Sequence, residues 1–326
     1  MLCLLLGGLV TPEDQHIADV DRAVALADRI GDPVLRFQAR EQVMWARLEQ
    51  ADIRAADVVF GELVAIAETV GLPHFRFRVA EFETGRALLA GRVTEAEAAN
   101  ERALEIGTAA GEREVLSFYG GLLYSIRLHQ GRVGEVAELF IAAADDMPDI
   151  PALRSAIPAM LCEIGRIEEA RERLLAEAAG GFDFPYDMFW LASMVNLADA
   201  AATTREPEVA RSLTELLSPF SDRIVAPSAI VVNGAVARPL ARVAAAAGAY
   251  DDAERWFATA DDLHAQLRAP YWTARGQLDH ADLCLARRSD GDLDRARDLA
   301  TASWLTAAEY GCAGLSERAV VILTGT

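Results

Sequence analysis

The sequence predicts an all-α protein, a right-handed α-α superhelix of about seven helical hairpins with a half-unit at each end. Two observations carry this prediction. A Gly-Arg-apolar phrase recurs at GRVTEA (91–96), GRVGEV (131–136) and GRIEEA (165–170), each time before an alanine-rich amphipathic stretch. No segment keeps the period-two alternation of a strand. The nearest is SAIVVN (228–233), whose position inside a helical unit assigns it to a helix.

Small residues recur in a fixed frame after the opening glycines. Ala96 and Ala103 are seven positions apart, and so are Ala253 and Ala260. Residues at this spacing lie two helical turns apart on one face, where small side chains let a neighbouring helix approach closely. Phe257 lies between the second pair on the same face. The pattern is therefore that of helix packing.

The end of each unit also repeats. Gly31, Gly71 and Gly111 are forty residues apart, and Pro33 and Pro73 follow two of them. Glycine just after a helix, with proline beyond it, is a stop signal because glycine tolerates the left-handed conformation. The unit is thus helix, glycine turn, helix, glycine stop. We expect a first helix at 13–31, a closing helix near 313–323, and hairpins near 33–71, 73–111, 113–147, 151–180, 186–220, 227–268 and 271–311.

We expect one solenoid over residues 1–326, with a truncated first unit (1–31), hairpins (33–311) and a closing helix with its tail (313–326). The opening MLCLLLGGLV is too short to span a bilayer and has no positively charged region before it. The four cysteines lie far apart, without a CxxC pair. This spacing is typical of reduced thiols, so a cytoplasmic protein without membrane contact is expected.

The charge balance excludes several classes of function. There are 31 basic against 50 acidic residues, a net charge of −19, which disfavours direct nucleic-acid binding. All 31 basic residues are arginine. P-loop nucleotide sites, protein kinases and Schiff-base enzymes each need a lysine, so none of them can be built here. No cofactor is expected.

Metal and acid–base motifs are weak. The densest metal-type cluster is Asp279, His280, Asp282 and Cys284, but helical geometry turns His280 about 100° away from Asp279. We therefore expect no metal site. Paired carboxylates recur at helix openings, as in GRIEEA and GAYDDA, where they complement the helix dipole. This repeated position favours capping over catalysis, and no catalytic residue is expected.

One local anomaly is the aromatic run GFDFPYDMFW (181–190). Aromatic rings beside a groove in a helical solenoid suit a peptide or another apolar ligand. The alternative is a wide joint between repeats that large side chains fill. Tyr271 and Trp272 after Pro270, with Arg275 one turn later, pose the same choice, and there the sequence favours packing. The candidate binding residues are Phe182, Phe184, Tyr186, Trp190, Tyr271, Trp272 and Arg275.

At GAYDDAERWFATA (248–260), preceded by Leu240, Ala241 and Ala244, the sequence resembles the tetratricopeptide repeat. The stretch 264–311 resembles the last repeats of the helical arm in large bacterial signalling regulators. These include LuxR-type ATP-binding activators, maltose-regulator-like (MalT-like) proteins and cyclase-associated ATPases. The sequence includes no ATPase, cyclase or helix-turn-helix module, so none of their chemistry is carried over to this chain.

The resemblance implies a non-catalytic interaction scaffold, the sensor arm of a bacterial transcriptional or signalling regulator. Its partner would be a protein or peptide on the concave face, or a small inducer. Two alternatives stay open. An all-α enzyme would gather acidic residues from several repeats, with raised pKa values, in one cleft. A structural oligomerisation module would self-associate through the apolar N-terminal half-unit at MLCLLLGG.

Overall fold

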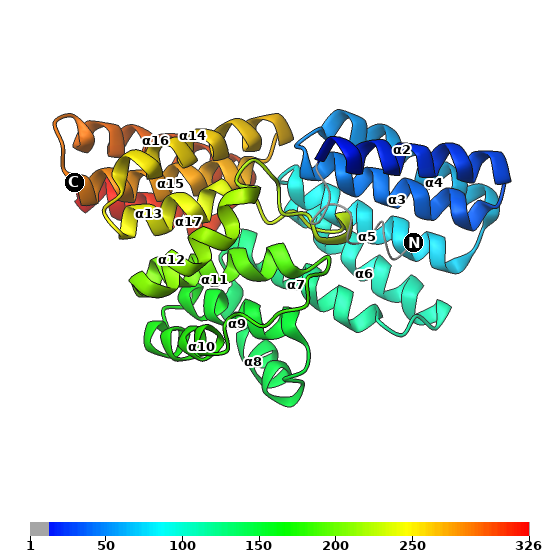
Figure 1. Ribbon diagram of the computed structural model, residues 1–326, viewed down its shortest axis with the longest axis horizontal. Coiled ribbons are helices and arrows are strands. Elements are labelled where there is room, and N and C mark those ends of the chain that lie inside the picture. Colours follow the sequence, from blue (N-terminus) through cyan, green and yellow to red (C-terminus); the bar gives the residue numbers. More distant parts are fainter. Residues whose placement is uncertain (1–12, 326) are drawn as a thin grey trace.

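The computed structural model describes residues 13–325, and the chain is all-α over this range (Figure 1). The expected fold class is confirmed: successive helical hairpins form an α-solenoid. The residues expected to form the apolar N-terminal patch, MLCLLLGG, lie outside the described range.

The helices are α2 (Glu13–Ile30), α3 (Pro33–Glu49), α4 (Ile53–Val70), α5 (Pro73–Leu89), α6 (Val93–Ala110), α7 (Val115–Gln130), α8 (Ala137–Asp146), α9 (Pro151–Glu163), α10 (Ile167–Ala179), α11 (Trp190–Thr204), α12 (Pro207–Leu217), α13 (Ala237–Ala246), α14 (Tyr250–Leu267), α15 (Pro270–Arg287), α16 (Asp292–Tyr310) and α17 (Ala313–Gly325), with 3₁₀ turns η1 (Val133–Glu135), η2 (Ser218–Phe220) and η3 (Pro227–Ala229).

Local sequence explains where the helices begin and end. Proline is the first residue of α3, α5 and α15, where its missing N–H costs nothing and its fixed φ suits the helix. Asp32 accepts hydrogen bonds from the first backbone N–H groups of α3. Gly71 and Gly111 follow α4 and α6 at φ of 70° and 72°, the left-handed conformation of a helix stop.

The small residues of the repeat frame lie in helix contacts. Ala96 and Ala103 are both buried on α6, which packs against α5. Ala253 and Ala260 are fully buried on α14 with Phe257 between them, and the ring of Phe257 stacks on His280 of α15. Close helix approach therefore accounts for their spacing.

The sequence prediction is wrong between α12 and α13. Residues 227–268 were expected to form one hairpin, but the chain from 221 to 236 is a mostly irregular segment, which we call the internal loop. Pro227 and the β-branched run Ile230–Val232 disfavour a helix here. Ile224 and Ala235 instead form an isolated antiparallel bridge, and most of the segment is buried.

The internal loop runs between the two ends of the solenoid. Figure 1 shows α2–α6 (blue to cyan) on one side, α13–α17 (yellow to red) on the other, and α8–α12 (green) below them. The N–H of Ile224 donates to the carbonyl of Glu49 at the end of α3, at 2.9 Å. The N–H of Ala235 donates to Nε2 of His264 on α14, also at 2.9 Å. The loop thus ties the first arm to the last.

The last repeats also pack on the middle ones. The ring of His129 on α7 stacks on Tyr271 of α15, with centroids 3.7 Å apart. A Cβ at Gly131 would lie 2.5 Å from the backbone nitrogen of Gly314, so α17 reaches the turn after α7. The solenoid is therefore curved back on itself.

Candidate ligand pocket

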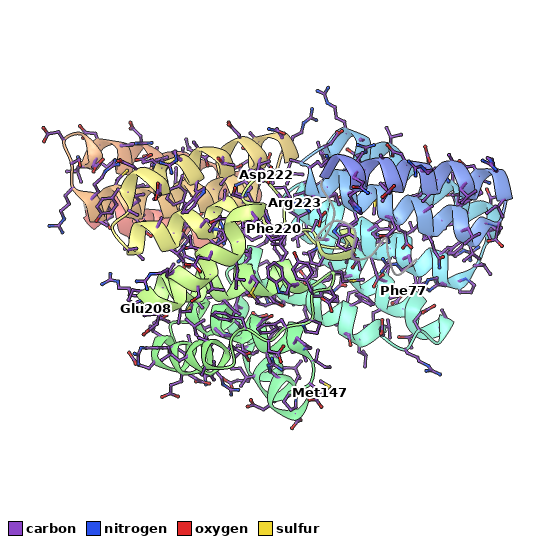
Figure 2. The ribbon with its side chains drawn as sticks, viewed as in Figure 1. Phe77, Met147, Glu208, Phe220, Asp222 and Arg223 are labelled. Atoms are coloured by element: carbon purple, nitrogen blue, oxygen red, sulfur yellow. The ribbon has the colours of Figure 1, made fainter. Side chains whose placement is uncertain are left out.

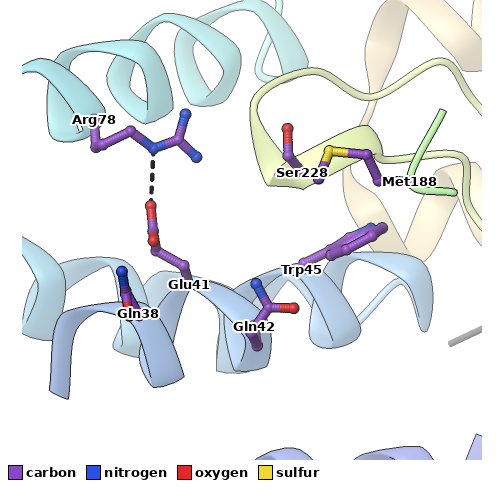
Figure 3. Close-up of a pocket in the computed structure, with 7 residues that line it drawn as sticks. All are labelled: Gln38, Glu41, Gln42, Trp45, Arg78, Met188 and Ser228. Atoms are coloured by element: carbon purple, nitrogen blue, oxygen red, sulfur yellow. Dashed lines mark hydrogen bonds and ion pairs between the residues drawn. The ribbon is translucent and has the colours of Figure 1, made fainter. Parts of the chain in front are cut away.

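A cavity of about 140 Å³ lies where the internal loop covers α3 and α5. Gln38, Glu41, Gln42 and Trp45 of α3 line it together with Arg78 of α5. Met188 and Ser228 complete the lining from the opposite side (Figure 3). The four α3 residues follow the spacing i, i+3, i+4, i+7, which places them on one helix face.

The charges of the pocket are paired with one another. Arg78 donates to Glu41 at 2.9 Å and to Glu81 at 2.6 Å, and its guanidinium group lies 4.8 Å from the ring centre of Phe82. Burial raises the pKa of Glu81 to about 7, and Arg78 only partly opposes this effect. Arg78 is therefore held between two acidic side chains and an aromatic ring.

Two polar atoms of the pocket have no hydrogen-bond partner among the described residues. They are the indole Nε1 of Trp45, whose residue is only 8% exposed, and the Oε1 of Gln42. Buried polar groups are nearly always paired, because an unpaired one loses its hydration without compensation. Both atoms are closed off from the open space of the cavity, so they are not contacts that the cavity offers to a ligand.

The part of the internal loop that covers the pocket has an unusual backbone conformation. Ser228 and Ala229 have φ of 47° and 60°, a region that non-glycine residues rarely adopt. The loop comes so close to α5 that a Cβ at Gly85 would lie 1.7 Å from the carbonyl oxygen of Ile230. The absence of a side chain at Gly85 thus lets this part of the loop dock on the helix.

A second hollow, of about 580 Å³, separates the α3–α4 turn from the end of α14. Gln50, Asp52 and Arg54 line one side, and Gln266 and Arg268 line the other. Within the described range, none of these side chains has a buried polar atom without a partner. The smaller pocket is the more enclosed of the two, and this makes it the stronger candidate.

The aromatic run 181–190 mainly forms packing contacts. Trp190 is buried between Tyr186 and Phe220, with ring centroids 4.7 and 5.7 Å away. Phe184 is buried beneath the guanidinium group of Arg154, and Phe182 is half-buried against the same core. Tyr186 is 39% exposed, so it is the ring of this group that a partner can reach.

Figure 2 shows Phe220, Asp222 and Arg223 between the two arms of the solenoid, where the chain leaves α12 for the internal loop. The aromatic run therefore fills a joint next to the entrance of that loop. Its member that lines the pocket is Met188, not one of its rings.

Tyr271, Trp272 and Arg275 are brought together, but in the interior. All three are buried. The indole N–H of Trp272 donates to the carbonyl of Val232 in the internal loop at 3.0 Å, and Arg275 donates to the hydroxyl of Tyr271 at 2.9 Å. Arg275 also pairs with Glu163 of α9. These contacts join three distant parts of the chain, as the packing alternative predicts.

The acidic cluster after Tyr271 is likewise used in ion pairs. His280 contacts Glu254 at 2.9 Å, and Asp279 and Asp282 both accept from Arg318. Between residues 13 and 325, no group of three or more His, Cys, Asp or Glu side chains is placed to hold a metal ion.

The candidate residues predicted from the sequence do not include the pocket residues of α3. The signal was present, since Gln38, Glu41 and Gln42 place three polar side chains on one face of a first helix, next to Trp45. It could be recognised only by knowing that this face turns toward another part of the chain.

No protein-family model and no curated protein matches this chain. Among solved structures, it is similar to a circular tandem repeat protein with a novel repeat topology and enhanced subunit contact surfaces. The identity is 14%, over 96% of this chain and 75% of that one, with a TM-score of 0.18. A likeness at that TM-score supports no functional argument. None of the helices described for the chain is long and apolar enough to cross a membrane.

Proposed function

We propose that the chain is a non-catalytic interaction scaffold, the cytoplasmic sensor arm of a bacterial transcriptional or signalling regulator. A small ligand in the pocket and a protein or peptide partner at its rim would be its two inputs. The resemblance to regulator arms motivates the regulatory role, and the helical-repeat fold suits it, because solenoids present extended binding surfaces.

The observation that carries the proposal concerns the carboxylates that converge from different repeats: they are charged and are paired with arginines. Asp199 of α11 and Asp279 of α15 meet Arg238 and Arg242 of α13 in the interior. Burial alone would raise the pKa of Asp199, but the two arginines lower it. The neighbouring arginines favour the charged form of both acids, and the geometry of the four side chains is that of cross-links between helices.

The enzyme alternative needs acids with raised pKa values in one cleft. Burial raises the pKa of Glu81 to about 7 and that of Asp261 to about 6. They lie on α5 and α14, in opposite arms of the solenoid (Figure 1). A general acid and a general base must reach one substrate, so this separation favours a scaffold.

The partner surface is proposed to lie around Tyr186. Its ring is exposed, it contacts Trp190 of the buried joint, and it is two residues from Met188 of the pocket. Exposed aromatic rings are frequent anchors of protein interfaces. A partner here would therefore sense changes in both the joint and the pocket.

The test is in-cell cross-linking of the tagged full-length chain, followed by mass spectrometry of the covalent adducts. Tyr186→Ala removes the exposed ring, and Leu139→Ser, at another exposed apolar position on α8, is the control. We expect one regulator with an ATPase, cyclase or DNA-binding module to be lost at least ~10-fold in Tyr186→Ala, as for an anchor residue, and kept in Leu139→Ser. Equal capture by both variants, or no reproducible adduct, contradicts the proposal.

A further inference from the structure

Glu81 is a carboxyl group enclosed where the internal loop meets α5. Its Oε2 accepts from Arg78 at 2.6 Å, and its Oε1 is buried without a hydrogen-bond partner among the described residues. A neutral carboxyl group tolerates an unpaired buried oxygen better than a carboxylate does, because the charge of a carboxylate needs solvation or pairing. The geometry therefore favours the protonated form of Glu81.

The charges around Glu81 favour the same form. Arg78 is shared with Glu41 of α3, to which it donates at 2.9 Å (Figure 3). Burial raises the pKa of Glu81, Arg78 opposes this rise, and Glu41 and Glu112 add to it. The part of the internal loop at 227–233 has no charged side chain that could compensate. An ionised Glu81 would thus be a poorly compensated charge in the interior.

The other charged groups of α5 are paired with other helices. Arg86 pairs with Asp57 of α4, and Glu83 pairs with Arg102 of α6 at 3.5 Å. A carboxylate at Glu81 therefore has to be stabilised by water, and water has to be admitted from a part of the surroundings that can move.

The internal loop is that part. Glu81 and Gly85 are four positions apart on one face of α5, and the carbonyl of Ile230 in the loop lies against Gly85. Ser228 and Ala229 have positive φ, so the closed loop is held against backbone strain. The loop also covers the cavity of about 140 Å³, which has room for water.

We propose that Glu81 is a proton-controlled latch for the internal loop. With the carboxyl group protonated, residues 226–233 lie closed on α5 and cover the cavity. When the proton is lost to solvent, the carboxylate draws in water and this span lifts, while the hydrogen bonds of Ile224 and Ala235 keep its ends in place. The latch goes beyond the proposed sensor role and does not depend on the identity of any ligand.

Hydrogen exchange of the full-length chain, followed by mass spectrometry at pH 5, 6, 7 and 8, tests this. Each exchange rate is divided by the intrinsic rate at the same pH, so that the ratio reports how often the loop opens, even when the open form is a minor population. Peptides that cover 224–236 report on the loop, and peptides of α16 in the last arm report on the rest of the solenoid.

The expected profile follows from the two pKa values of Glu81, about 7 in the closed form and 4.5 once the group is in water. The closed form binds the proton more tightly, so opening should increase about 40-fold between pH 5 and 7 and only about 2-fold more up to pH 8. Peptides of α16 should show no such increase.

Three variants separate the latch from other effects of pH. Glu81→Gln keeps the shape of the side chain but cannot ionise, so its loop should change less than ~3-fold over this range. Glu83→Gln, which breaks the exposed pair with Arg102, should keep the wild-type profile. Glu41→Gln removes a carboxylate that raises the pKa of Glu81, so its increase should level off at a lower pH.

The latch would be disproved by a flat profile of the wild-type loop, by a wild-type profile in Glu81→Gln, or by an equal increase in α16, which would indicate a change in global stability. Circular dichroism establishes that each variant is folded. If Glu81→Gln is not, Glu41→Gln provides the test, and a profile unchanged from the wild type would then count against the latch.

Discussion

At the scale of single residues, Glu81 is a carboxyl group that the fold keeps in an unfavourable place. It is 1% exposed, and burial raises its pKa from 4.5 to about 7 although Arg78 lies 2.6 Å away. Glu41 and Glu112 add to this rise. The folded state therefore holds the proton more tightly than the unfolded state. This tighter binding of the proton by Glu81 stabilises the folded state. The stabilisation is fully present below pH 4.5 and is lost as the pH rises toward 7.

Glu81→Gln keeps the shape of the side chain and removes this titration. The free energy of unfolding of the variant, relative to the wild type, should rise between pH 4.5 and 7 and then level off. The rise should be roughly 3 kcal/mol, since one pH unit of pKa change corresponds to about 1.4 kcal/mol. Urea denaturation at pH 5, 6, 7 and 8 measures it. Glu83→Gln on the same helix is the control, and a constant difference for Glu81→Gln across this range would contradict the raised pKa.

At the scale of secondary structure elements, local signals were sufficient for the helices and insufficient for the internal loop. Stops such as Gly71 and Gly111 depend on φ preferences of a single residue, which a sequence displays directly. The loop depends on long-range contacts: Gly85 leaves it room, and the Glu49 carbonyl and His264 hold its ends. None of these is visible within the segment 221–236 itself.

The candidate site also depends on contacts between distant parts of the chain, which the sequence does not display. The aromatic run and the group around Tyr271 were recognisable as unusual, but composition does not show which rings a neighbouring repeat covers. Five of the seven candidate residues are buried, and Tyr186 is exposed. The pocket forms only where α3, α5, Met188 and Ser228 meet, and these lie far apart in the sequence.

Gly85→Ala tests whether the loop depends on this one helix surface. The added methyl would lie 1.7 Å from the Ile230 carbonyl oxygen, so either the loop or the helix must move. We expect a loss of about 2–4 kcal/mol in the free energy of unfolding, as for overpacking against backbone. The pocket should open as well, because the internal loop that covers it moves away from α5.

Gly61→Ala is the matched control, because Gly61 is also inside a helix but has no atom within 4 Å of the new methyl group. This change should raise stability by up to ~1 kcal/mol through helix propensity. If the two alanine variants had similar stability, the tight contact between loop and α5 would be refuted.

At the scale of the whole molecule, a buried ionic network joins α11 to the first helices of the last arm, α13, α15 and α17. Arg238 of α13 pairs with Asp199 of α11 and donates to Asp279 of α15 at 2.8 Å, while Arg318 of α17 donates to Asp279 at 2.8 Å. Burial alone would raise the pKa of Asp279, but Arg318, Arg242 and Arg238 hold it well below its ordinary range. One carboxylate thus connects first helices of successive repeats.

Asp279→Asn should therefore destabilise more than its own helix. It removes the carboxylate that Arg238 and Arg318 share and leaves them only Asp199 and Asp282 as partners. Removing one partner of a buried ion pair costs about 3–5 kcal/mol. Hydrogen exchange should show lost protection in α11, α13, α15 and α17 together. Glu208→Gln, which breaks the exposed pair with Arg211, should cost less than ~1 kcal/mol. Loss of protection confined to α15 would mean that the repeats of this arm are held by apolar packing alone, and that the network adds no coupling between them.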